Sequence, residues 1–269
     1  MTIELQHKIG KKVSPDIKKS QLSIHHSQFT KKVLAFTLAE TLIVIGIIGI
    51  VSALTLPNLN SSTGDKEKIA KLQKLYQNLN DALGRAEAAY GPIGVWTVND
   101  DCSSGYNPCS KRIGERLTEF MKISKTCGMD AGNGCFKSGM SKRLNGQFYQ
   151  DYDNNRYSYK VITADGISLY INCSKIQCGF DVDIDGPNKG VYTLGKDVFM
   201  FKCTSDKKVY PYGESENFST ILSNLKPSGA AYYAAAWIIS YDNMDYLKLD
   251  SNGKCPNGTT PTESNPRCK

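Results

Sequence analysis

Residues 36–56 read FTLAETLIVIGIIGIVSALTL, and this stretch decides how the chain is organised. It contains a single charged side chain, that of Glu40. An α-helix of this length, rising about 1.5 Å per residue, would span about 30 Å, which is the thickness of the hydrocarbon core of a bilayer. Lysines precede the stretch, and positive charge is retained on the cytoplasmic side. The pattern therefore predicts a transmembrane helix, with the rest of the chain facing outward.

A cleaved secretory signal and a plain membrane anchor each explain only part of this stretch. A cleaved secretory signal has a shorter apolar region that ends at small residues, which Val51-Ser52-Ala53 match weakly. A plain single-span anchor fits the length. Neither explains Glu40, because a carboxylate at that depth costs roughly 3 kcal/mol unless it is paired.

The segment from Lys31 to Ile45, KKVLAFTLAETLIVI, resembles the cleavage and methylation segment of type IV pilin-like proteins. The resemblance implies cleavage by a prepilin peptidase between Ala35 and Phe36, although the family has Gly where this chain has Ala35. It implies N-methylation of Phe36 and pairing of Glu40 with the N-terminal amine of a neighbouring subunit during assembly. It also implies a helix kink at Pro57.

The resemblance and the chain's own pattern together predict five segments. Apolar residues recur at spacings of three and four over 69–86, which indicates one face of an amphipathic helix. The predicted fold class is α+β, with a long N-terminal transmembrane stalk helix packed on a small antiparallel sheet, as in pilins. The segments are a prepilin leader at 1–35, the transmembrane half of the stalk helix at 36–57, its amphipathic half at 58–90, a Cys-rich variable connection at 91–145, and an antiparallel sheet head with a Cys-stapled tail at 146–269.

Alternating polar and apolar residues predict four strands in the head. Two of them flank Ala164-Asp165-Gly166, a strong hairpin signal. The four strands are expected at 157–163, 167–171, 178–184 and 197–202, with helices at 113–123 and 217–225. Residues 231–239 fit either a helix or a buried strand, and 244–249 indicate a last short strand.

Nine cysteines occur, and none precedes residue 102. Their spacings include no C-x-x-C, so an oxidised, exported domain fits better than a thiolate zinc site. The odd number leaves one cysteine over, either as a thiol or joined to another chain. The candidate disulfide partners are Cys102 and Cys109, Cys127 and Cys135, Cys173 and Cys178, and Cys255 and Cys268.

Composition argues against catalysis and against nucleic-acid binding. All three histidines, His7, His25 and His26, lie in the expected leader, so the processed chain would have none. This excludes Ser–His, Cys–His and His-ligated metal chemistry, and we predict that the protein is not an enzyme. The first 35 residues carry seven lysines and two acidic residues, hence +5 of the +7 net charge. The remainder has no strong positive field, so a nucleic-acid partner is not indicated.

Asp181, Asp183 and Asp185 form a D-x-D-x-D-G pattern, which matches the opening of a calcium loop. Its twelfth position is Tyr192 in place of the Glu of an EF-hand, so the three aspartates are candidate calcium ligands of another kind. The alternative is a strand that ends in an acidic turn of structural purpose. The 15 tyrosines and two tryptophans fit either a sugar-binding or adhesion surface or, more simply, core packing.

The sequence thus predicts a structural subunit, either a pseudopilin of a type II secretion system or a major or minor pilin of a type IV pilus. Its expected partners are prepilin peptidase, other pilin or pseudopilin subunits, the inner-membrane assembly platform and the membrane. Its expected location is the bacterial cytoplasmic membrane, as a single-pass protein with the head outside the cytoplasm, and the filament after assembly. The alternative is a single-span, membrane-anchored extracytoplasmic binding or adhesion protein, or an enzyme, unrelated to filaments.

Overall fold

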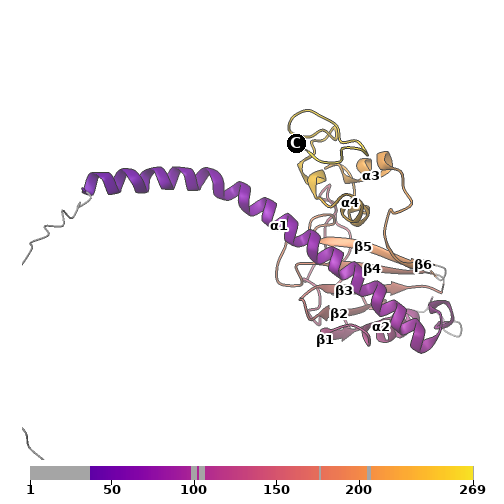
Figure 1. Cartoon of the computed structure of the whole chain (residues 1–269). Coiled ribbons are helices and arrows are strands. Elements are labelled where there is room, and N and C mark those ends of the chain that lie inside the picture. Colours follow the sequence, from indigo (N-terminus) through magenta and orange to yellow (C-terminus); the bar gives the residue numbers. More distant parts are fainter. Residues whose placement is uncertain (1–36, 98–101, 103–106, 176, 205–206, 269) are drawn as a thin grey trace, which may run out of the picture. The chain divides into compact units, whose positions relative to one another are not determined.

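The computed structural model describes residues 37–97, 102, 107–175, 177–204 and 207–268, except for the side chains of 52–63 and 207. Figure 1 shows these elements. The chain divides into two compact units, residues 1–52 and residues 53–269, and each is described by itself.

Helix α1 (Leu38–Tyr90) begins in the first unit and ends in the second. Thr37 precedes it, and the helix ends where Gly91 takes a positive φ of 80° and its N–H donates to the carbonyl of Glu87. A glycine in this conformation is a common helix terminator, because it has no Cβ to clash. The helix continues through Pro57. The kink expected at that residue stays a prediction.

The predicted transmembrane helix is not found, and the predicted fold class is wrong for this reason. Within the described part of the chain, no helix is both long enough and apolar enough to cross a membrane.

The second unit contains a six-stranded antiparallel sheet in which each strand pairs with the next along the chain. Four strands match predicted ones, whereas the two edge strands β1 and β6 were not predicted. Three consecutive residues of β1 are exposed and only Cys127 is buried, so this strand lacks the alternation that marks a half-buried strand. The strands are β1 (Ile123–Gly128), β2 (Tyr159–Thr163), β3 (Ser168–Cys173), β4 (Gln177–Asp183), β5 (Val198–Thr204) and β6 (Lys207–Pro211).

The later part of α1 packs on one face of this sheet (Figure 1). The ring of Tyr76 stacks on that of Phe201 in β5, with centroids 5.6 Å apart. Five of the six residues of the predicted apolar face are buried, Tyr76 is partly buried, and Leu75 and Ala82 are buried in addition. The buried residues of this part of the helix are Ile69, Leu72, Leu75, Leu79, Ala82, Leu83 and Ala86. Burial of this stripe against the sheet holds this part of α1 in place.

Shorter helices surround the sheet. Helix α2 (Pro108–Thr118) begins five residues before the predicted helix, because Asn107 caps it and Pro108 occupies its first position. Helix α3 (Phe218–Leu225) lies where a helix was expected, and α4 (Ala234–Tyr241) resolves the ambiguous segment as a helix. The last predicted strand is wrong. Its residues form the 3₁₀ helix η2 (Asp245–Lys248), and a second 3₁₀ turn, η1 (Ile93–Val95), follows α1.

The sheet face opposite α1 is covered by the connection before β2. Tyr152 is fully buried there, with its ring 4.9 Å from that of Tyr170 in β3 and 5.1 Å from that of Phe136. Both faces of the sheet are therefore packed. The buried aromatic residues account for much of the tyrosine and tryptophan content as core.

Candidate functional site

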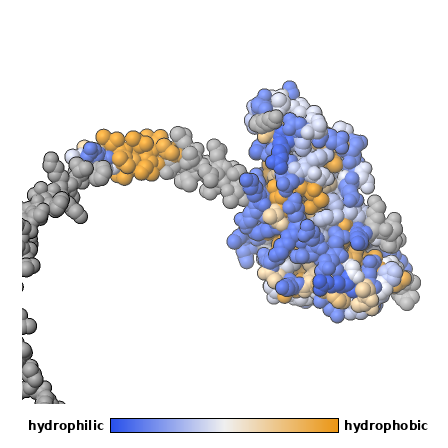
Figure 2. Space-filling view, in the orientation of Figure 1, coloured by the Kyte–Doolittle hydropathy of each residue, from blue (hydrophilic) through white to orange (hydrophobic). Residues whose placement is uncertain are grey.

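The first part of α1 exposes apolar side chains around the helix. Figure 2 shows this surface as a continuous apolar patch. Each of its large apolar residues has at least half of its surface exposed: Leu38, Leu42, Ile43, Val44, Ile45, Ile47, Ile48, Ile50 and Val51. A helix that is apolar on all sides is normally covered, because contact with water is unfavourable for every face.

Glu40 lies in the first turn of this helix and bonds to the residue that precedes it. Its Oε2 accepts hydrogen bonds from the backbone N–H and the hydroxyl of Thr37, each at 2.9 Å. The N–H of Glu40 donates in return to the Thr37 hydroxyl oxygen at 3.2 Å. This reciprocal pattern is a capping box. It provides acceptors for backbone N–H groups at the start of the helix that have no hydrogen-bond partner within the helix.

The capping box sets the charge state of Glu40. The Thr37 backbone N–H, and then its hydroxyl, lower the pKa of Glu40, so the group stays ionised at neutral pH. Within the described residues, Oε1 accepts no further hydrogen bond, so one carboxylate oxygen is available to an outside donor. From the sequence, Glu40 was expected only as an intersubunit partner. Its local role is also signalled there, by T-x-x-E before an apolar run.

The predicted cleavage and methylation site, Ala35 and Phe36, lies outside the described residues. Both of those predictions therefore stay predictions.

The acidic loop after β4 is arranged around a buried pair of carboxyls. Asp183 and Asp197 are both inaccessible to solvent. Burial, and then the charge of Asp197, raises the pKa of Asp183 to about 8. Asp197 accepts the backbone N–H groups of Tyr192 and Thr193 at 2.7 and 2.6 Å, so it holds the loop that leads into β5.

The three predicted calcium ligands do not share one site. Asp181 and Asp183 are two residues apart on β4, hence about 7 Å apart along the strand. The Asp185 carboxylate instead pairs with the Lys68 ammonium of α1 at 2.9 Å. Within the described part of the chain, no group of three or more His, Cys, Asp or Glu residues is arranged to hold a metal ion. The side chains of Asp181, Asp183 and Asp185 are therefore not arranged to bind one calcium ion together.

Lys68 and Asp197 were not singled out from the sequence. The Lys68 ammonium also donates to the carbonyl of Lys196 at 3.1 Å, so it joins α1 to both sides of the loop. A lysine on a polar helix face carries no sequence signal for such a contact, because its partners are more than 100 residues away along the chain.

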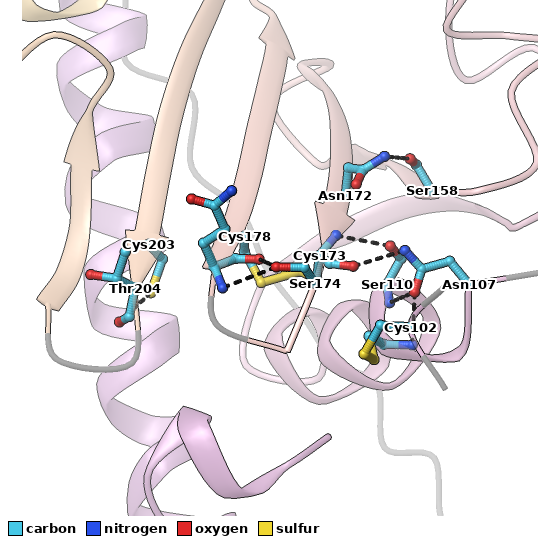
Figure 3. Close-up of a disulfide and its surroundings, with 12 residues drawn as sticks. Cys102, Asn107, Ser110, Ser158, Asn172, Cys173, Ser174, Cys178, Cys203 and Thr204 are labelled. Carbon is cyan, nitrogen blue, oxygen red and sulfur yellow. Dashed lines mark hydrogen bonds between the residues drawn. A yellow bond between two sulfur atoms is a disulfide. The ribbon is translucent and has the colours of Figure 1, made fainter. Parts of the chain in front are cut away.

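Each of the four candidate cysteine pairs is joined by a disulfide. Figure 3 shows Cys173–Cys178, which links β3 to β4, beside the start of α2. The Asn107 amide donates to the carbonyl of Cys173 at 2.7 Å. The ninth cysteine, Cys203, is buried opposite Cys178 in register, and its thiol donates to the carbonyl of Thr204.

No protein-family model, curated protein or solved structure matches this chain. The pilin-like resemblance therefore rests on the segment around Phe36 alone, and the functions that it implies are proposals.

Proposed function

We propose that this chain is a structural subunit of a pilin-like filament, in a type II secretion system or a type IV pilus. In this proposal, prepilin peptidase cleaves before Phe36, the new terminus is N-methylated, and the apolar start of α1 packs against the same segment in other subunits. The inner-membrane assembly platform would bring the subunits together. The protein would act mechanically and not as an enzyme.

The exposed apolar segment Leu38–Val51 carries this proposal. Nothing in its own unit covers these side chains within the described residues, since each large one is at least half exposed. Neighbouring copies of the same helix would bury them on several sides at once. At about 25 cal/mol per Å² of apolar surface, such burial provides a strong driving force for assembly.

Glu40 supports a defined register for that packing. It is the only acidic side chain in the segment, and it stays ionised through its bonds to Thr37. An ionised carboxylate within an apolar assembly is stable only when it is paired. The α-amine of Phe36 in a neighbouring subunit would supply the partner, and the remaining oxygen, Oε1, can accept its bond.

The disulfides support a location of the second unit outside the cytoplasm. Four of them lie within that unit. Disulfides persist in oxidising compartments and are rare where thioredoxin and glutathione keep thiols reduced.

N-terminal sequencing and intact-mass measurement of the protein from its native host test the processing step. We expect a methylated Phe36 at the start. A chain that starts at Leu54 would instead identify a secretory signal and contradict the proposal.

Two substitutions separate the charge of Glu40 from its capping role. Glu40→Gln keeps a side chain that can complete the capping box but removes the charge, so we expect normal cleavage and loss of filament incorporation. Thr37→Val removes the hydroxyl and with it two of the three hydrogen bonds of the capping box, but it leaves the backbone N–H and the charge of Glu40, so we expect incorporation to continue. Incorporation of Glu40→Gln at the wild-type level, measured in sheared filament fractions, would remove the proposed pairing.

A further inference from the structure

The sheet face opposite α1 contains a hollow of about 280 Å³ that Gly179 of β4 helps to line. In register, Gly179 lies between Asn172 of β3 and Lys202 of β5. A Cβ built on Gly179 would meet only the Asn172 carbonyl oxygen, at 3.8 Å, so the space above this residue is open. The hollow thus exists because the central position of three adjacent strands has no side chain.

Aromatic and acidic side chains line the hollow. The rings of Tyr149 and Tyr170 and the side chain of Met200 form apolar walls. Asp181 lies between Tyr170 and Met200 in register, lines the hollow, and is only 8% exposed. A carboxyl that is buried to this degree needs hydrogen-bond donors. The hydroxyl of Tyr152 is one of them: burial raises the pKa of Asp181, and the hydrogen bond from Tyr152 lowers it against this effect. A carboxylate accepts more than one hydrogen bond, so a ligand in the hollow can donate to the same group.

The charges around the hollow select against a ligand of net charge. Burial raises the pKa of Asp181 to about 7, and the ionised form of this carboxyl would oppose an anion. Lys202 also lines the hollow and would oppose a cation; its ammonium rests over the ring of Tyr212, 3.8 Å from the centroid. A neutral molecule with many hydroxyl groups satisfies both, because each hydroxyl donates and accepts.

From this geometry we propose that the hollow binds one neutral pyranose ring of a carbohydrate. The C–H face of the sugar would rest on the ring of Tyr149, and its hydroxyls would bond to Asp181, Asn172 and Lys202. The volume lies just below the range of about 300–1,000 Å³ that is common for ligand pockets, which fits a single ring better than an extended glycan. This site is independent of the proposed assembly role, because it uses no residue of the exposed apolar segment.

Titration of the full chain with the methyl glycosides of glucose, galactose, mannose and N-acetylglucosamine tests the proposal. Saturation-transfer difference NMR gives the readout, in a detergent whose head group is not a sugar. We expect at least one glycoside to bind with a Kd on the order of 1 mM, as is usual for a ligand of this size. Absence of binding by all four, or binding of amines or amino acids alone, would overturn the proposal.

Gly179→Leu fills the hollow without backbone strain, and we expect at least a tenfold loss of affinity with an unchanged melting temperature. Gly84→Leu is the matched control, because Gly84 also has open space at its Cβ and lies on α1, outside the hollow. Asp181→Asn keeps the shape and weakens the hydrogen bonds to the hydroxyls, so we expect roughly a tenfold loss. This variant decides the question if Gly179→Leu does not fold. Wild-type affinity in whichever of these two variants folds would refute the site.

Discussion

Replacing Asp183 by Asn should stabilise the protein at neutral pH. The carboxyl is inaccessible to solvent, and its pKa is raised to about 8 by burial and by Asp197. The same group in the unfolded chain has a pKa of about 3.9. Between pH 4 and pH 8 the folded protein therefore holds a proton that the unfolded chain releases. The free energy of unfolding falls as the pH rises through this window.

The size of the effect follows from the shift. At pH 7 the difference from the unfolded pKa is about 3 units, which corresponds to at most about 4 kcal/mol. Asn has the same shape as Asp and cannot ionise. Asp183→Asn should therefore raise the free energy of unfolding by a large part of these ~4 kcal/mol at pH 7 and by almost nothing at pH 4. Ser168 lies directly opposite in register, and neither its Oγ nor Asp183 Oδ2 has a hydrogen-bond partner among the described residues. The new amide can donate there.

Urea denaturation of the full chain from pH 4 to pH 9 measures this, with the fluorescence of the buried Trp96 and Trp237 as the signal. Asp81→Asn is the control, because this exposed carboxyl makes only a surface pair with Arg85, worth about 0.3–0.5 kcal/mol. The reasoning fails if Asp183→Asn and the wild type show the same dependence of stability on pH.

Three further predictions concern packing and disulfides. Leu79→Ala should lower the free energy of unfolding by about 2–5 kcal/mol in urea denaturation, because Leu79 is fully buried between α1 and the sheet. Gly114→Ala should cost about 1–3 kcal/mol, since its Cβ would overlap the ring of Tyr159, whereas Gly84→Ala, which meets nothing, should not destabilise. A thiol reagent followed by mass spectrometry should modify Cys203 only after unfolding, because it is buried; modification of another cysteine without reductant would contradict the four disulfides.

Local patterns predicted the elements whose signals lie within a few residues. The hairpin at Asp165-Gly166 joins β2 to β3, and the apolar spacing of 69–86 is the buried face of α1. The spacing of the cysteines also led to the four disulfides, since each closes a loop of at most 13 residues.

The wrong predictions concern segments whose local sequence pattern fits more than one structure. Residues 244–249 are apolar enough for a strand, yet they form a 3₁₀ turn against α3. Residues 36–56 met the length for a transmembrane helix, but the described part of the chain contains no helix suitable for one. The D-x-D-x-D-G pattern suggested a metal site. However, the side chains of alternate residues on a strand do not converge on one point, and the Asp185 carboxylate is paired with the ammonium of Lys68.

The sequence by itself determined the apolar segment with its one carboxylate, Glu40, and the cysteine framework, because composition and short spacings carry that information. Only the tertiary structure decided the environment of the acidic loop and the hollow above Gly179. Lys68 reaches Asp185 through the packing of α1 on the sheet, and Asp197 comes beside Asp183 through the pairing of β4 with β5. The hollow requires three strands in one register, with a glycine at the central position. Contacts between residues so far apart in the chain depend on the summed packing of the whole unit, and no local pattern records them.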